Sequence, residues 1–309
     1  MAAPTRSNDR ILRGVVMMVA FCLAAPLIDI ASKLAVQTVP VSTVTLARFL
    51  VQGVLMVPVM LVMRAQLALN RATAKLLVWR ALVSILSTYC FVAAVRVMPV
   101  ADALAIAFVE PFIILLIGKL VLREQVGPRR LGAALVGFGG ALLVIQPGFV
   151  QFGWVVLFPL GTALAFALYI LITRHLGHQM DPEPMQFHTA WIAAFLLVPV
   201  LWLADGSGLA GLDPAWPQAT AWVWTFGVGL AATVSHLFIS YALRYAPSST
   251  LAPLHYLEIV MAVTLGYLVF GTLPNALTWA GIAVISASGL YVIHRERLAL
   301  KPEPAAARR

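Results

Sequence analysis

Ten apolar segments, each about long enough to cross a lipid bilayer, constrain this chain more than any other feature of its sequence. They cover approximately residues 14–36, 41–63, 76–96, 100–122, 129–146, 153–175, 185–204, 219–243, 249–271 and 276–294. A transmembrane helix needs about 20 mostly apolar residues, and a helix satisfies its own backbone hydrogen bonds in lipid. Of the 309 residues, 61% are hydrophobic and 11% charged, whereas soluble domains are about a quarter charged. The sequence therefore predicts an all-α integral membrane protein with ten transmembrane helices.

The distribution of basic residues predicts the orientation. With ten spans, 17 of the 21 Lys and Arg residues fall on one side, including Arg80 in the group around the loop between spans two and three. Lys and Arg are enriched on the cytoplasmic side of membrane proteins. We therefore expect a multi-pass protein of a cell inner membrane with cytoplasmic tails at 1–10 and 295–309. The net charge of +9 lies at span ends, which argues against a nucleic-acid partner.

One pattern of arginine, proline, glutamate and glycine occurs twice along the chain. Four residues recur at a constant offset of 148: Arg96, Pro99, Glu110 and Gly118 match Arg244, Pro247, Glu258 and Gly266. Each copy holds five spans, an odd number, so the second copy must enter the membrane from the opposite side. Inverted repeats of this kind are typical of secondary transporters, whose substrate sites lie near the bilayer midplane between the repeats.

The repeated motif resembles the EamA-type members of the drug/metabolite transporter superfamily. The residues that carry the resemblance are Arg96, Pro99, Pro111, Gly118, Glu124, Gly132 and Gly140, with Arg244, Pro247, Gly266, Gly281 and Gly289 in the second copy. The resemblance implies two inverted five-helix repeats, over 11–147 and 152–294. The chain departs from the family pattern at Glu110, where an apolar or small residue is common, and at Thr272, which replaces an acid. Members carry amino acids, nucleosides, vitamins and other metabolites, so the resemblance implies a transporter without fixing its substrate.

Glu110 and Glu258 are the first candidates for function. Each lies about ten residues into its span, which at about 1.5 Å per residue places it near the midplane. Ionisable residues at that depth are costly and mark substrate paths or proton relays. We predict that these acids, with His255 on the helix face of Glu258, bind substrate or carry a proton; the alternative is a structural hydrogen bond to a neighbouring helix. Pro111 and Pro253 each remove a backbone hydrogen bond, so we expect helix breaks beside a cavity.

Three charged residues in the first two spans are expected to contact one another. Asp29 and Lys33 are four residues apart in span one, and Arg48 in span two lies at a depth similar to that of Asp29. Buried charges are usually paired. We predict an ion pair or triad with a gating role near the outer end of the cavity, and direct substrate contact is the alternative.

Polar side chains in spans three and eight are further candidates for substrate binding. Thr88 and Tyr89 lie in span three, and His236 in span eight is related to Thr88 by the same offset of 148. Hydroxyl and imidazole groups in such positions can bind substrate, and hydrogen bonding between helices is the alternative.

These features predict a secondary transporter that moves a small polar metabolite by alternating access, driven by a proton gradient or by exchange. An amino acid or a derivative is the favoured substrate, and a vitamin or nucleoside such as riboflavin is the alternative. An intramembrane enzyme that uses Glu110 and Glu258 as an acid–base pair is the rival class; inverted duplication argues against it, because chemistry does not require it. We expect no metal or other cofactor. The expected partners are the substrate and the bilayer, with the protein a monomer or a homodimer.

Overall fold

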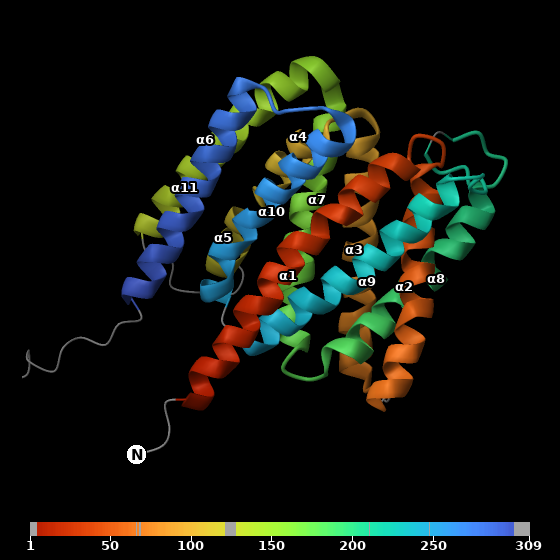
Figure 1. Ribbon diagram of the computed structural model, residues 1–309. Coiled ribbons are helices and arrows are strands. Elements are labelled where there is room, and N and C mark those ends of the chain that lie inside the picture. Colours follow the sequence, from red (N-terminus) through yellow and green to blue (C-terminus); the bar gives the residue numbers. More distant parts are fainter. Residues whose placement is uncertain are drawn as a thin grey trace, which may run out of the picture.

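The computed structural model describes residues 5–65, 67, 69–120, 128–209, 211–246 and 248–299, and over these ranges it is helical without strands. The elements are α1 (Thr5–Ala35), α2 (Val41–Met63), α3 (Arg71–Val97), α4 (Val100–Ala107), α5 (Glu110–Leu120), α6 (Pro128–Phe152), the 3-10 helix η1 (Gly153–Val156), α7 (Leu157–Leu176), α8 (Pro182–Ala204), α9 (Ala221–Tyr245), α10 (Ser248–Phe270) and α11 (Ala276–Ala299). The helices run up and down between two faces (Figure 1). We call the face on which α1 begins the N-terminal face.

In the part of the chain that the structure describes, six helices are long and apolar enough to cross a membrane. They cover Arg10–Ala35, Val41–Met63, Arg71–Val97, Phe149–Leu176, Pro182–Ala204 and Ala221–Tyr245. Large apolar side chains point outward from them, such as Val62 at 81% and Trp202 at 77% exposed. Soluble proteins rarely expose such surface, so the outside of this bundle suits lipid. All ten predicted segments fall on helices, whereas the count of ten spans and the side of the termini stay predictions.

The fourth predicted segment is divided in two. Helix α4 ends at Ala107 and α5 begins at Glu110, and the peptide N–H of Val109 bonds back three residues, to the carbonyl of Ile106 at 3.2 Å. Pro111, the second residue of α5, has no N–H to give to Ala107, which accounts for a break one turn before it. The expected break at Pro253 is wrong: α10 is helical throughout Ser248–Phe270. Pro253 is the sixth residue of that helix, so the carbonyl of Ser249 loses one helical donor without the helix ending there.

The helices pack in matched couples. The contact of α1 with α9 corresponds to that of α7 with α3. The contact of α1 with α10 corresponds to those of α7 with α4 and α5, and the contact of α2 with α9 corresponds to that of α8 with α3. The remaining extensive contacts join α2 to α8 and α6 to α11, and the last pair lies side by side at one edge of the bundle (Figure 1). This correspondence matches the helices of the first half, in chain order, to α7, α8, α9, α10 and α11, with α4 and α5 counted as one helix. Under it, the α2–α8 and α6–α11 contacts each correspond to themselves.

Small residues let α6 and α11 approach closely. A Cβ atom added to Gly281 would lie 2.7 Å from the carbonyl oxygen of Gly140 and 2.4 Å from the Cγ2 atom of Val144. Only glycine fits that contact without moving backbone. Small residues at such crossings stabilise helix packing in lipid through close van der Waals contact.

Candidate functional site

A cavity of about 110 Å³ lies inside the bundle. Side chains from α1, α2, α3, α4, α5, α7, α9 and α10 line it. Six of the residues singled out in the sequence are among them: Asp29, Arg48, Thr88, Glu110, His236 and Glu258. The cavity is smaller than the 300 to 1,000 Å³ or so of typical small-molecule sites. A metabolite of ordinary size therefore requires it to enlarge.

Three carboxylates reach this cavity from three different helices. Asp29 lies on α1, Glu110 is the first residue of α5, and Glu258 lies on α10; all three are buried. The Oδ2 atom of Asp29 has no hydrogen-bond partner among the described residues. A buried polar atom without a partner is costly in an apolar surrounding. The helix break places Glu110 at the start of α5, where the helix dipole favours a negative charge.

The predicted ion pair or triad of Asp29, Lys33 and Arg48 is not formed. Among the described residues, Lys33 Nζ instead donates a 2.6 Å hydrogen bond to the Met98 carbonyl oxygen, and it lies 5.4 Å from the centre of the Phe270 ring. Lys33 is also absent from the cavity lining, because it stands one helical turn beyond Asp29. Asp29 and Arg48 both line the cavity, but no ion pair between them is found among the described residues.

Arg48 is held by the two repeat-related positions. Its Nη1 group donates to the hydroxyl of Thr88, and its Nη2 group contacts His236 Nε2 at 2.9 Å. The guanidinium also lies 4.6 Å from the centre of the Phe49 ring. The equivalence of Thr88 and His236 in the sequence thus becomes a shared contact in space.

Tyr89 lies away from the cavity, and the side chains of His255 and Pro253 are outside the described part of the chain. Tyr89 does not line the cavity and packs instead beside the apolar cluster that contains Ala31 and Val92. It follows Thr88 directly, so it points about 100° away around the helix. His255 and Pro253 belong to α10, but their side chains lie outside the described residues.

Arg80 corrects the sequence analysis most clearly. We expected it among the cytoplasmic loop charges, but it is ten residues inside α3 and fully buried. Its Nε donates to Thr173 Oγ1 at 2.9 Å, its Nη1 to Thr189 Oγ1 at 2.5 Å, and its Nη2 to Tyr169 Oη at 2.5 Å. The guanidinium also stacks 4.3 Å from the centre of the Tyr169 ring. Arg80 therefore joins α3, α7 and α8 in the bundle interior.

Tyr169 connects Arg80 to the cavity. Its hydroxyl oxygen lies 2.8 Å from His236 Nδ1, on the imidazole that contacts Arg48. Gln186 braces the same region, because its amide donates to the His236 carbonyl oxygen at 3.0 Å and to Ser240 Oγ at 2.8 Å. A hydrogen-bonded chain thus runs from the cavity through His236 and Tyr169 to Arg80. The signal for it in the sequence was the position of Arg80 after the first apolar residues of its span.

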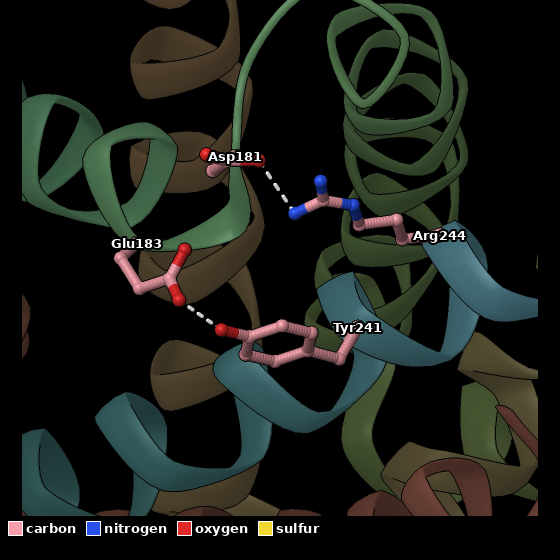
Figure 2. Close-up of polar contacts among 4 residues, drawn as sticks. All are labelled: Asp181, Glu183, Tyr241 and Arg244. Carbon is pink, nitrogen blue, oxygen red and sulfur yellow. Dashed lines mark hydrogen bonds and ion pairs between the residues drawn. The ribbon is translucent and has the colours of Figure 1, made fainter. Parts of the chain in front are cut away.

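A larger cavity, of about 1130 Å³, opens at the N-terminal face. It is lined by the start of α1, the end of α2, the α7–α8 turn and the end of α9. Two contacts tie α8 to α9 there (Figure 2): Arg244 Nη1 lies 2.5 Å from Asp181 Oδ1, and the Tyr241 hydroxyl donates to Glu183 Oε1. We call this cavity the vestibule and these two contacts the α8–α9 latch.

Aromatic side chains complete the lining of the central cavity. They are Phe21, Phe91, Phe108 and Phe166, from α1, α3, the α4–α5 break and α7. Aromatic rings with a few placed polar groups are the usual lining of small-molecule sites. A lipid-facing helical bundle with a polar, partly aromatic cavity inside and a vestibule at one face is the architecture of a polytopic membrane transporter.

The chain belongs to the EamA-like transporter family, within the drug/metabolite transporter superfamily: the family profile matches residues 12–146 and again 153–294. Among its relatives, the "Riboflavin transporter" of Rhizobium johnstonii is 30% identical over 217 residues, which is 70% of this chain and 69% of that protein. The "S-adenosylmethionine uptake transporter" of Rickettsia prowazekii is 22% identical over 289 residues, or 93% of this chain and 94% of that one.

A solved crystal structure supports the fold. It superposes with a TM-score of 0.65 at 15% sequence identity and covers 96% of this chain and 99% of its own. At that identity the likeness concerns the fold alone. The relatives' names differ in substrate, and both describe a transporter.

Proposed function

We propose that this protein is a secondary transporter that moves a small polar metabolite across a cell inner membrane by alternating access. The observation that carries the proposal is the cavity in which Asp29, Glu110 and Glu258 meet Arg48 and His236. Ionisable groups inside a membrane bundle almost always face a substrate path or one another.

The matched packing couples support alternating access. Two five-helix units whose contacts with each other are matched in this way can exchange conformations, which opens the shared cavity to one side and then to the other. The vestibule lies at the N-terminal face, which the basic residues assign to the cytoplasm. In this proposal the α8–α9 latch lies at the cytoplasmic entrance and changes as that entrance opens and closes.

An amino acid or a derivative is the substrate class we favour. Three buried acids and one guanidinium around a single cavity suit a ligand that carries an ammonium or similar cationic group together with polar atoms. Riboflavin is the second candidate, because four phenylalanines line the same cavity and a flavin ring stacks well on aromatic faces.

Reconstitution into proteoliposomes tests the transport proposal. Vesicles loaded with a candidate amino acid, S-adenosylmethionine or riboflavin should exchange it for labelled external substrate, and the substrate should be recovered chemically unchanged. Recovery of a modified compound would favour the rival enzyme. If none of these compounds, nor a wider panel of amino acids, nucleosides and vitamins, is exchanged above empty vesicles, the proposal is wrong.

The same vesicles test proton carriage by the acids. We expect Glu110→Gln or Glu258→Gln to abolish accumulation driven by an imposed pH gradient, because an amide cannot carry a proton. Exchange at equal pH should be affected less. Asp205→Asn is the matched control, since Asp205 is an exposed acid at the end of α8. Intact gradient-driven accumulation in both glutamine variants would show that neither Glu110 nor Glu258 carries the proton.

A further inference from the structure

Two guanidinium groups are buried in this bundle without a carboxylate beside them. Arg48 is 3% exposed and Arg80 is 0% exposed, and among the described residues neither lies within ion-pair distance of an acid. Both are held by uncharged groups. A buried charge without a counter-charge is costly unless its donors are satisfied or an anion arrives.

Arg80 has its donors satisfied. Its Nε, Nη1 and Nη2 groups each donate to a hydroxyl, on Thr173, Thr189 and Tyr169 respectively. Arg80 is also absent from the lining of the central cavity. Its environment is complete, so its role is to join helices.

Arg48 differs on both points. It lines the central cavity, and its buried Nε atom finds no hydrogen-bond partner within the described ranges. Thr88 and His236 hold its two Nη groups, which fixes the guanidinium in place and leaves Nε–H as an open donor. An arginine fixed in this way is prepared for an acceptor that the protein does not supply.

His236 does not supply a negative charge to balance Arg48. Arginine only donates, so His236 Nε2 must accept from Arg48, and the ring is then neutral with its proton on Nδ1, directed to Tyr169. The contacts of Arg48 thus contain hydrogen-bond acceptors but no negative charge.

We propose that Arg48 binds an anionic group of the transported substrate, a carboxylate or a phosphate. This inference rests on the transporter function proposed above and narrows its substrate class. Asp29, which is 8% exposed and has an unpartnered Oδ2, lines the same cavity from α1. Two residues of the cavity lining thus carry an unpartnered donor and an unpartnered acceptor on different helices, which suits a dipolar molecule once the cavity enlarges. Riboflavin carries no carboxylate or phosphate, so the inference favours amino-acid-type substrates over it.

Thermal unfolding of the full chain in detergent, with small probes of matched shape, tests this assignment. The probes are acetate, its uncharged isostere acetamide, and inorganic phosphate, each titrated at constant ionic strength. We expect acetate or phosphate to raise the Tm of the wild type in a saturable way and acetamide to have no such effect. The difference between the acetate and phosphate arms identifies the favoured anion.

Variants of Arg48 then test whether the anion binds at this residue. Arg48→Gln should weaken the apparent affinity for the anion at least about tenfold, as expected for the loss of a charge-assisted hydrogen bond. Arg64→Gln should leave it unchanged, because Arg64 is an exposed arginine of the vestibule. If Arg48→Gln does not fold, Arg48→Lys keeps the charge but loses the planar fork, and it should bind the anion more weakly than the wild type.

Two results would overturn the assignment: no saturable anion response in the wild type, or an equal response in the wild type and in the folded Arg48 variants. Its failure is distinguishable from failure of the transport proposal. Exchange of an uncharged substrate in proteoliposomes with no anion response refutes the role of Arg48 and leaves transport intact. Anion binding at Arg48 without exchange of any compound refutes transport alone.

Discussion

Replacement of Tyr169 by phenylalanine removes one oxygen atom from the centre of the buried polar chain. The phenyl ring should stay in place, because it stacks on Phe166 with ring centres 5.5 Å apart and lies under the Arg80 guanidinium. The hydroxyl, however, accepts from Arg80 Nη2 and, at 3.3 Å, from Gln186 Nε2, and it bonds to His236 Nδ1. The variant therefore isolates the energetic role of these three hydrogen bonds.

The expected cost follows from the groups left without a partner. A hydrogen bond to a charged donor contributes about 1.5 to 3 kcal/mol and one between neutral groups about 0.5 to 1.5 kcal/mol. The site is fully enclosed, so water cannot readily take the place of the oxygen. We therefore expect Tyr169→Phe to lower the free energy of unfolding by about 2 to 4 kcal/mol, with Tm falling by roughly 1.5 °C per kcal/mol in a chain of this size.

Denaturant or thermal unfolding of purified protein in one detergent measures this change. Tyr267→Phe is the control, because the same atom is removed from a ring that is 53% exposed on α10, and the change there should stay within about 0.5 kcal/mol. If Tyr169→Phe is no more destabilising than this control, the hydrogen-bonded chain between Arg80 and His236 does not contribute to stability and the reasoning fails.

Two further predictions concern helix packing and the vestibule. Gly281→Ala should destabilise the bundle by more than about 1 kcal/mol, because its Cβ would meet the backbone oxygen of Gly140. Gly139→Ala, which has open space around it, should be neutral or slightly stabilising in the same unfolding assay. Equal effects of the two substitutions would contradict the close α6–α11 contact. Asp181→Asn should change stability by less than about 1 kcal/mol, because Arg244 and Asp181 are 37% and 59% exposed. The same substitution should change the rate of substrate exchange in proteoliposomes if the α8–α9 latch forms the entrance, and an unchanged rate would remove the latch from the mechanism.

The sequence predicted that Glu110 and Glu258 converge, but it did not predict the partners of Arg48. Glu110 and Glu258 could be placed together because the same offset relates a whole motif, so helix order and depth followed from counting residues. The partners of Arg48 could not be predicted in this way. Residue depth along a span is readable from sequence, but rotation about the helix axis is not, and rotation decides whether Arg48 meets Asp29 or Thr88.

Arg80 shows a second limit. Arginines at span ends mark topology, and the apolar pattern alone placed Arg80 close enough to an end to be counted there. In the structure α3 begins at Arg71, five residues before the predicted start of the span, so Arg80 lies well inside the bundle. The hydroxyls that satisfy it come from α7 and α8, nearly 100 residues away, and no local signal identifies them.

The interruption between α4 and α5 gives the two matched glutamates different positions in their helices. Helix α4 is packed among α3, α6, α7, α10 and α11, whereas α5, which begins with Glu110, packs mainly on α6 and α7. Glu258 is borne by the uninterrupted α10. Glu110 therefore lies on a short helix that residues 108 and 109 join to α4, whereas Glu258 lies within one continuous helix. Duplication supplied two copies of one acid, and a proline beside only one of them accompanies a different helical setting for each.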